Sequence, residues 1–263
     1  MVNFQCKEFY DVDDLRELIA LLRSDNGCPW DREQTHESIR RNFLEETYEA
    51  CEAIDEGDPE HLKEELGDVL TQVVFHAGIE EDAGRFDLDQ VADAVCKKLI
   101  YRHPHVFGDT EVKDSENVLV NWDQLKRRER RQETTASVMD SVSKSLPSTW
   151  RAEKIQSKAK KVGFDWADTS GAMDKLSEEI AELQEALKTG VGVLEELGDV
   201  LFSTVNVARL AGVDPEDALH SSCEKFVSRF RYMEEESMRR GQRLEDMTID
   251  QQEVLYQQGK ERL

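Results

Sequence analysis

The sequence predicts an all-α protein built from two tandem copies of one helical module. Period-two alternation of β-branched residues is nearly absent, whereas apolar residues recur widely at helical spacing. The heptapeptide EELGDVL occurs at residues 64–70 and again at residues 195–201. The chain contains only five prolines, and each stands at an expected helix edge: Pro29, Pro59, Pro104, Pro147 and Pro215.

The repeat extends well beyond the heptapeptide. FLEETYEACEAI matches LSEEIAELQEAL, CKKLIYRH matches CEKFVSRF, VNWDQLKRRER resembles VLYQQGKERL, and CPWD parallels GFDW. Such a long period, present only twice, indicates a domain duplication, because a solenoid would have shorter units and more of them. We therefore predict an N-terminal module at residues 1–131, a polar linker rich in Ser and Thr at residues 132–149, and a C-terminal module at residues 150–263.

Composition and charge argue against several classes of protein. The chain has 263 residues, of which 35% are charged, with a formal net charge of −23 and a mean hydropathy of −0.65. An acidic surface disfavours binding to nucleic acid backbones and to anionic membranes. No apolar run approaches the roughly 20 residues of a membrane span, and no signal peptide is visible at the N-terminus. Five cysteines without close pairs are expected to be reduced thiols, so we predict a cytoplasmic protein.

Carboxylates interrupt the apolar face of the first predicted helix pair. On a helical wheel of residues 39–54, Glu46 falls inside the apolar stripe and Glu49 lies at its border. In the helix that carries the heptapeptide, Glu65 lies beside the apolar stripe and shares a face with Asp68. Glutamates are rarely buried unless they are paired or bind a metal. The second copy repeats the pattern with Glu179, Glu182, Glu196 and Asp199.

The turn after each first helix sets the heights of these carboxylates. The acidic residues before and after Gly57 are nearly equidistant from it along the chain, and the same holds for Gly190. If each turn joins an antiparallel pair, the four carboxylates of a copy meet and need a cation. Their oxygen atoms favour Mg²⁺, with Mn²⁺ as a substitute. Gly67 and Gly198 cost helix propensity, which predicts a close approach of the facing helix or of a ligand.

Basic and aromatic side chains recur on the later helices of both copies. Pairs of basic residues lie four apart on one helical face, and an aromatic residue lies one turn before a lysine. Such a ring can stack on a base while the cations reach phosphates. The residues concerned are Lys98, Arg102, Trp122 and Lys126 in the first copy, and Lys175, Lys225, Arg229, Tyr256 and Lys260 in the second.

Together these motifs resemble the MazG family of nucleoside triphosphate pyrophosphohydrolases in its two-domain bacterial form. The resemblance covers nearly the whole chain and rests on GCPWDREQT, LEETYEACEAI, EELGDVLTQVVFHA, RHPHVFGD and KKVGFDW. The family pattern E-E-x-x-E followed by E-x-x-D fits both copies. It implies four-helix modules assembled as a homodimer, and Mg²⁺-dependent cleavage of a nucleoside triphosphate to the monophosphate and pyrophosphate.

The resemblance also implies a division of labour, in which the C-terminal module carries most of the activity and the N-terminal module is largely structural. It makes Glu179, Glu182, Glu196 and Asp199 the expected Mg²⁺ ligands, with Glu46, Glu49, Glu65 and Asp68 as their N-terminal counterparts. Lys175, Lys225, Arg229 and Lys260 would hold phosphates. Tyr256 would lie against the base, where the family pattern leads us to expect a tryptophan. No missing residue explains why the N-terminal copy would be inactive.

The expected reaction needs no covalent intermediate. Mg²⁺ neutralises the triphosphate and a carboxylate-bound water attacks in line, with Glu178 as a candidate to orient that water. One alternative is a di-iron carboxylate bundle, although such sites use Glu-x-x-His and this chain has Asp68 or Asp199 at the last position. A second alternative is a non-catalytic acidic helical scaffold or regulatory protein, against which the retained carboxylates of both copies argue.

Overall fold

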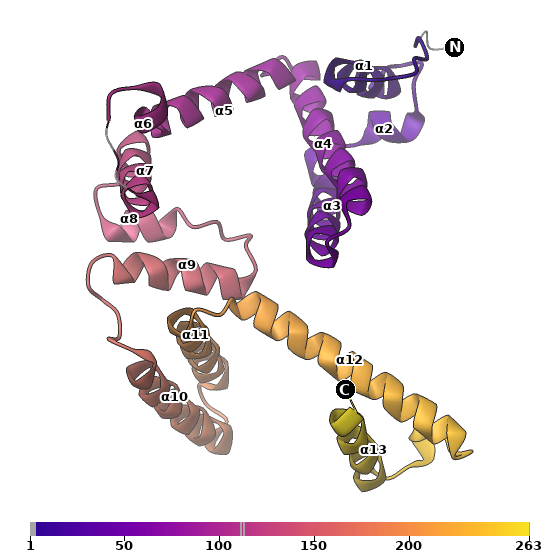
Figure 1. Ribbon diagram of the computed structural model, residues 1–263, viewed down its shortest axis with the longest axis vertical. Coiled ribbons are helices and arrows are strands. Elements are labelled where there is room, and N and C mark those ends of the chain that lie inside the picture. The colour runs from indigo at the N-terminus through magenta and orange to yellow at the C-terminus, as the bar shows by residue number, and fades with distance from the viewer. Residues whose placement is uncertain (1–3, 111, 113, 263) are drawn as a thin grey trace. The chain divides into compact units, whose positions relative to one another are not determined.

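The computed structural model describes residues 4–110, 112 and 114–262, and all the regular secondary structure within them is helical. The predicted all-α fold is confirmed. The chain, coloured from its N-terminus to its C-terminus in Figure 1, divides into two compact units, Met1–Leu125 and Lys126–Leu263. No helix formed by the described residues has the length and apolar character needed to cross a membrane.

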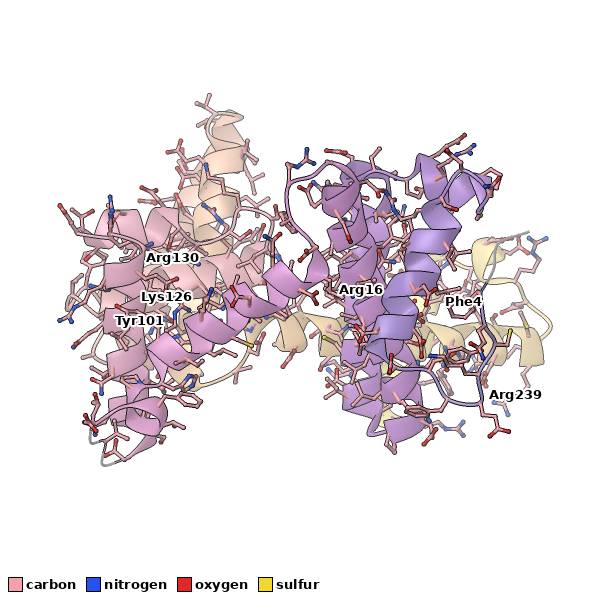
Figure 2. All side chains as sticks on the ribbon, turned by 90° about the horizontal axis from the view of Figure 1, so that it is seen from above. Phe4, Arg16, Tyr101, Lys126, Arg130 and Arg239 are labelled. Atoms are coloured by element: carbon pink, nitrogen blue, oxygen red, sulfur yellow. The ribbon has the colours of Figure 1, made fainter. Side chains whose placement is uncertain are left out.

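The N-terminal unit is organised around a long antiparallel helix pair, α3 and α4. α1 packs on α4, and Arg16 of α1 (labelled in Figure 2) forms a 3.0 Å ion pair with Asp89 of α5. α7 starts in this unit and continues into the next. The helices are α1 (Val12–Arg23), α2 (Pro29–Glu33), α3 (His36–Glu56), α4 (Pro59–Asp82), α5 (Leu88–Arg102), α6 (Pro104–Phe107) and α7 (Ser115–Glu129).

A two-residue turn fixes the register of α3 against α4. α3 ends at Glu56 and is capped by Gly57, which has φ 68°, in the left-handed region that glycine adopts without steric cost. The side chain of Asp58 then accepts hydrogen bonds from the backbone N–H groups of Glu60 and His61, and Pro59 fills the first helical position. The chain therefore reverses at once, which brings residues equally far from Gly57 to the same height.

The core of the N-terminal unit lies where α1, α3 and α4 meet. Ile19, Ile39, Val74 and Phe75 are buried together, one from α1, one from α3 and two from α4. Partly buried apolar side chains extend this cluster: Leu15, Leu22, Leu70, Ile79 and Leu88. Burial of aliphatic and aromatic side chains is the main contribution to the stability of such a small helical unit.

The C-terminal unit repeats the antiparallel pair with α10 and α11. The turn contains Gly190 with φ 74° and Gly192 with φ 78°. The short helix α8 forms within the residues expected to be a linker, and it packs on α9. The elements are α8 (Thr135–Asp140), α9 (Ser148–Lys160), α10 (Thr169–Thr189), α11 (Val193–Ala211), α12 (Pro215–Arg239), a 3₁₀ turn, η1 (Leu244–Asp246), and α13 (Ile249–Arg262).

α9 connects the helix pair to the long helix α12. α9 packs against α11 and also contacts α12, where Trp150 Nε1 donates a 3.1 Å hydrogen bond to Asp214, the N-cap of α12. From there α12 runs away from the α10–α11 pair, and α13 folds back against it (Figure 1). The C-terminal unit thus has two parts, a helix pair flanked by α9 and an arm made of α12 and α13.

Candidate active site

Three carboxylates meet on the facing surfaces of α10 and α11. Glu179, Glu196 and Asp199 each offer one oxygen atom within 4.8 Å of the others. Glu179 is buried in line with Ala172 and Ala186 on one face of α10, as its place in the apolar stripe predicted. We call these three residues the C-terminal carboxylate cluster. Their proximity is what a cation-binding site needs, because like charges this close repel one another unless a cation compensates them.

Glu182 lies at the edge of this cluster, one turn along α10 from Glu179. Burial raises the pKa of its carboxyl group above the ordinary value, and the negative charges of Glu179 and Glu196 raise it further. The fourth predicted ligand is therefore close enough to Glu179 and Glu196 to interact with them electrostatically, although it stands outside the group of three. A bound cation would remove this repulsion.

Lys175 supplies a positive charge beside the cluster. Its Nζ lies 2.8 Å from Glu178 Oε1 and 2.9 Å from Glu179 Oε1. Hydrogen bonds to Glu178 and then to Glu179 raise the pKa of the lysine, so it stays protonated at neutral pH. Glu178, the candidate for orienting water, points toward solvent and pairs with Lys175. The lysine thus holds the Glu179 carboxylate in place at the entrance to a cavity.

A cavity of about 540 Å³ opens next to the cluster. Lys175, Glu179 and Asp199 line one part of it. Apolar side chains from α9, α10, α11 and the α9–α10 loop form other walls: Ile155, Phe164, Trp166, Ala172 and Phe202. A concave, mostly apolar site with a few polar groups and an adjacent charged cluster is typical of small-molecule binding. We call it the C-terminal chamber.

The polar wall of the chamber is held by a hydrogen-bonded group. Arg209 forms an ion pair with Asp165 and also donates to Asn206 Oδ1 from Nε at 3.1 Å. Gln156, 6% exposed, donates from Nε2 to the carbonyl oxygen of Phe202 at 2.8 Å. Because that carbonyl can only accept, the orientation of the amide is fixed and Oε1 points the other way. Oε1 has no hydrogen-bond partner among the described residues.

These chamber residues were missed by sequence reasoning. GFDW served as a parallel to CPWD and as part of the family resemblance, with no role for Asp165 or Trp166. Asn206 lies on a helix that was interpreted mainly for its carboxylates, and the helix that carries Gln156 was given no functional role. A usable signal exists in the repeat itself, because aligning the two copies of EELGDVL places Asn206 opposite Phe75. A polar residue that replaces a core aromatic residue in one copy points to a difference in function.

The N-terminal unit holds a related carboxylate cluster. Glu46, Glu49 and Glu65 offer oxygen atoms within 4.8 Å of one another. Burial raises the pKa of Glu46, and the charge of Asp68 raises it further, so the fourth predicted ligand again lies nearby. Burial also raises the pKa of Glu65, followed by the charge of Glu49. We call Glu46, Glu49 and Glu65 the N-terminal carboxylate cluster.

Gly67 and Gly198 face open space. A methyl group placed on either residue would meet no atom of another helix within 4 Å. The facing helix therefore does not approach these glycines closely, and that half of the prediction is wrong. Approach by a ligand stays a prediction.

Comparison with known proteins supplies the family. A model described as the MazG nucleotide pyrophosphohydrolase domain matches residues 34–107 and 168–233. Over 254 residues the chain is 42% identical to the nucleoside triphosphate pyrophosphohydrolase of Escherichia coli (strain K12), a match that covers 95% of this chain and 97% of that protein. The chain belongs to the MazG family.

Two further relatives of this MazG chain match over similar lengths. The chain is 42% identical over 248 residues to a nucleoside triphosphate pyrophosphohydrolase/pyrophosphatase MazG of Thermotoga maritima, covering 94% of this chain and 95% of that one. It is 44% identical over 256 residues to an uncharacterized protein, YabN, of Bacillus subtilis (strain 168), covering 96% of this chain and 52% of that protein. The resemblance to the MazG family that the motifs indicated is confirmed.

Apart from Lys175 on α10, the substrate-binding residues predicted for the C-terminal module of this MazG chain lie on the arm. Arg229 of α12 donates a 3.3 Å hydrogen bond to the hydroxyl of Tyr256 on α13, and its guanidinium lies 5.5 Å from the centre of that ring. Lys225 and Lys260 are exposed on the same two helices. No hydrogen bond or ion pair within the described part of the chain joins these four residues to the C-terminal carboxylate cluster. Of the predicted cations of the C-terminal unit, Lys175 therefore pairs with the carboxylates of its own chain, whereas Lys225, Arg229 and Lys260 lie on the arm.

An arginine also lies over an aromatic ring on the N-terminal side of the MazG repeat. The guanidinium of Arg102 lies 5.3 Å from the ring centre of Trp122, which joins α5 to α7. Lys98 is exposed one turn before Arg102, and Lys126 follows Trp122 by one turn on α7. An arginine over an aromatic ring is thus a shared feature of the two copies. It orders the ring and the guanidinium together.

Proposed function

We propose that this chain is a Mg²⁺-dependent nucleoside triphosphate pyrophosphohydrolase that works through its C-terminal module. The observation that carries the proposal is the position of the C-terminal carboxylate cluster, two of whose members line a chamber large enough for a nucleoside. The relatives from Escherichia coli and Thermotoga maritima are named for this activity. The proposed reaction cleaves a nucleoside triphosphate to the monophosphate and pyrophosphate.

The donor set of the cluster fits a hard divalent cation. Glu179, Glu196 and Asp199 would hold the ion, and Glu182 lies close enough to act as a further ligand. All these donors are carboxylate oxygens, which suit Mg²⁺ or Mn²⁺ better than they suit iron or zinc. A di-iron site would include histidine nitrogen, and none belongs to this cluster. When bound, the ion would neutralise the triphosphate and activate a water molecule.

The protein side chains position the substrate. Trp166 and Phe164 offer apolar surface for the nucleoside, and a flat ring beside a base favours stacking. Lys175 stands at the junction of chamber and cluster, where the phosphates of a nucleotide would begin. The ion pair between Arg209 and Asp165 joins α11 to the α9–α10 loop at the chamber wall. Enclosure of the nucleoside would exclude bulk water and strengthen the electrostatic interactions at the phosphates.

We further propose that a second copy of this chain completes the site with the cations of its arm. Each chain leaves apolar side chains exposed on the helix pair, among them Leu187, Leu194 and Leu201, and on the arm, among them Phe226 and Phe230. Burying both sets in a dimer would contribute about 25 cal/mol for each Å² of apolar surface removed from water. Phe226 and Phe230 flank Arg229, so covering them would carry the arm's cations to the partner's carboxylates.

Pyrophosphate release is the test of the proposed function. We expect the parent chain to release pyrophosphate from nucleoside triphosphates when Mg²⁺ is present and to stop when a chelator removes it. Glu179→Gln and Asp199→Asn should each lower the rate by about 100-fold or more, because an uncharged ligand no longer holds the ion. Glu185→Gln is the matched control on the exposed side of α10 and should keep the parental rate. Parental rates in both cluster variants would refute the site.

A further inference from the structure

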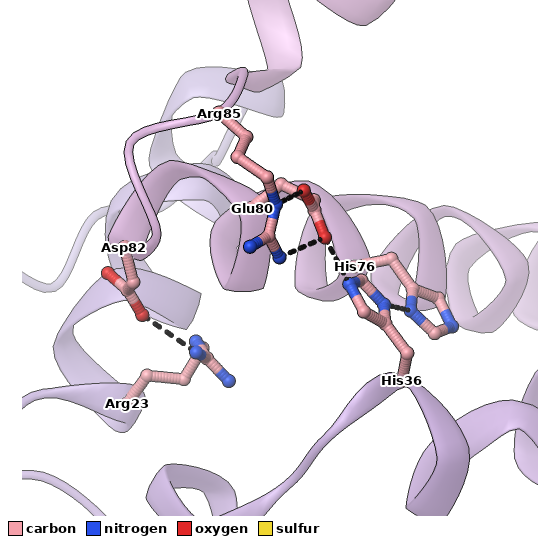
Figure 3. Close-up of polar contacts among 6 residues, drawn as sticks. All are labelled: Arg23, His36, His76, Glu80, Asp82 and Arg85. Carbon is pink, nitrogen blue, oxygen red and sulfur yellow. Dashed lines mark hydrogen bonds and ion pairs between the residues drawn. The ribbon is translucent and has the colours of Figure 1, made fainter.

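Two histidines meet between α3 and α4 of the N-terminal unit. His36 is the first residue of α3, and His76 lies in the last two turns of α4. Their Nδ1 atoms are 2.7 Å apart, and their ring planes are inclined by only 11°. The ring centres are 5.0 Å apart, so the rings meet through these nitrogens and not through their faces (Figure 3). One hydrogen bond between two imidazoles thus joins the start of α3 to α4.

The contact of His36 with Glu80 fixes where the ring protons lie. Hydrogen bonds from Arg85 and then from His36 lower the pKa of Glu80 to about 2, so at neutral pH its carboxylate only accepts hydrogen bonds. Because His36 Nε2 lies 2.5 Å from Glu80 Oε1, that nitrogen carries a hydrogen atom. The bond between the two Nδ1 atoms needs one further hydrogen, which either ring can supply. It therefore forms when both rings are neutral and also when one of them is protonated.

A proton on each ring breaks this hydrogen bond. Both Nδ1 atoms then carry hydrogen, so neither can accept, and two positive charges face each other. His36 keeps its carboxylate partner, whereas no carboxylate of the described residues pairs with His76, so His76 is the ring that leaves. Its departure also ends the contact with the ring of Phe43 on α3, whose centre is 5.5 Å away. The α3–α4 pair then loses two contacts at this end.

The surroundings of the pair resist this second proton. Burial lowers the pKa of His76 from its ordinary 6.5, and the charge of His36 lowers it further. Among the described residues, no other charge adds to burial in this way. Four charged groups drawn with the pair in Figure 3 are engaged in two ion pairs: Glu80 with Arg85, and Asp82 with Arg23 of α1. Because His76 binds its proton more weakly in the folded chain than in the unfolded one, folding loses stability as the pH falls below 6.5.

The C-terminal unit has no counterpart of this histidine pair. The repeated glutamate motif aligns His36 with Thr169, the first residue of α10, and the repeated heptapeptide aligns His76 with Val207 on α11. Neither threonine nor valine titrates near neutral pH. The pair is therefore not part of what the two modules share, and its protonation acts on one module alone.

We propose that His36 and His76 form a pH-sensitive latch, which is closed while at most one ring is protonated and opens when both are. The side chain of His36 is 37% exposed, so protons reach the pair from solvent. In the closed state the latch holds the start of α3 against α4. In the open state His36 stays with Glu80, and His76 turns away with its added proton on Nδ1. The N-terminal unit thus loosens in mildly acidic solution, and neither carboxylate cluster takes part.

Thermal unfolding of the full chain at pH 7 and pH 5 tests the latch. The first unfolding transition of the parent should fall by about 2 °C or more beyond the fall seen in His76→Gln. An amide at that position can donate to His36 or accept from it, so the contact survives without titrating. His36→Gln removes the second proton from the other side and should show the same small fall. His220→Gln, an exposed histidine of α12, is the matched control and should follow the parent.

Nuclear magnetic resonance of the isotope-labelled chain observes the hydrogen bond itself. At pH 7 the two Nδ1 atoms should show a scalar coupling through the hydrogen they share, and at pH 5 this coupling should be gone. Glu80 stays ionised over this range, so its titration does not contribute. A coupling that persists at pH 5, or none at pH 7, would overturn the latch. Equal falls of the unfolding transition in the parent and in both glutamine variants would do the same.

Discussion

Glu179 and Glu65 stand at the core-facing positions of the two carboxylate clusters, and their immediate neighbours differ. Lys175 lies 2.9 Å from Glu179, whereas the residue at the matching place in the N-terminal unit is Asn42. Glu65 has instead a contact with His61 at 3.3 Å. The C-terminal cluster therefore has a permanent positive charge at its border, where an anionic substrate would arrive. This one-residue difference agrees with the difference between the chamber and the packed core.

Filling the chamber should lower the activity strongly while leaving the carboxylates intact. The double variant Ala172→Ile with Asn206→Phe gives the C-terminal unit the same residue types that the N-terminal core has at the matching positions, Ile39 and Phe75. We expect pyrophosphate release to fall by about tenfold or more, because a filled pocket rejects the nucleoside. The measurement is the steady-state rate, with Mn²⁺ binding as a check that the cluster survives.

The contrast with a smaller side chain makes this result specific. Asn206→Ala removes a hydrogen-bond acceptor from Arg209 but leaves the chamber open, so its rate should decline less than that of the filled variant. If the filled variant kept the parental rate, the nucleoside would have to bind elsewhere.

At the scale of helices, a charged network ties the start of α3 to the end of α4. Glu80 accepts two hydrogen bonds from Arg85 and lies 2.5 Å from His36 Nε2, which in turn lies against His76 (Figure 3). The guanidinium of Arg85, and then His36, lower the pKa of Glu80 from 4.5 to about 2. Three segments of the N-terminal unit are joined at one carboxylate.

This network predicts a pH-dependent stability. Because the pKa of Glu80 is lower in the folded chain than in the unfolded one, its contribution is complete above pH 4.5 and is lost as the pH falls toward 2. Glu80→Gln should therefore lower the midpoint of thermal unfolding at pH 7, and its difference from the parent should shrink between pH 4.5 and pH 2. Glu81→Gln, an exposed neighbour, is the control. An equal difference at pH 3 and pH 7 would rule out the charge as the cause.

Helix types, turns and the carboxylate clusters were predictable from sequence, because each depends on local signals. Gly57 and Gly190 mark turns where only glycine is comfortable, and the intrusion of Glu46 and Glu179 into apolar stripes is visible on a helical wheel. The chamber was not predictable in the same way. It depends on how α9 packs against α11 and on the size difference between Asn206 and Phe75, which acquires meaning only when the helices are placed side by side.

The sequence pattern also did not predict where the cations of the arm lie relative to the carboxylates. Lys225 and Arg229 were expected at the phosphates, and their spacing on one helical face is correct. Helical spacing does not predict the direction in which α12 runs relative to the other helices. Within one chain α12 runs away from α10 and α11 (Figure 1). In the dimer that we propose, the distance between these cations and the carboxylates depends on how two chains assemble.

At the scale of the whole molecule, mixing two inactive chains tests whether sites are shared between copies. Asp199→Asn lacks a ligand, and the double variant Lys225→Ala with Lys260→Ala lacks two exposed cations of the arm. If each site takes carboxylates from one copy and cations from the other, random mixing should restore about a quarter of the parental rate. The measurement is pyrophosphate release after the chains have been unfolded and refolded together.

A second mixture provides the control for shared sites. Asp199→Asn mixed with Glu179→Gln should remain inactive, because both defects lie in the carboxylate cluster and every site of the mixed dimer keeps one of them. Recovery in this control, or none in the first mixture, would show that each chain builds its own site.

The packed N-terminal unit and the C-terminal unit with its cavity should also differ in how much a bound ligand stabilises them. The N-terminal unit already buries Ile39 and Phe75 in its own core, whereas the C-terminal unit leaves Phe164, Trp166 and Phe202 around a cavity. A nucleotide that enters the cavity stabilises the unit that holds it by mass action and leaves the other unchanged. Substrate concentration would then set how often the C-terminal unit opens, and the lifetime of this half of the enzyme in the presence of proteases would follow the supply of nucleotide.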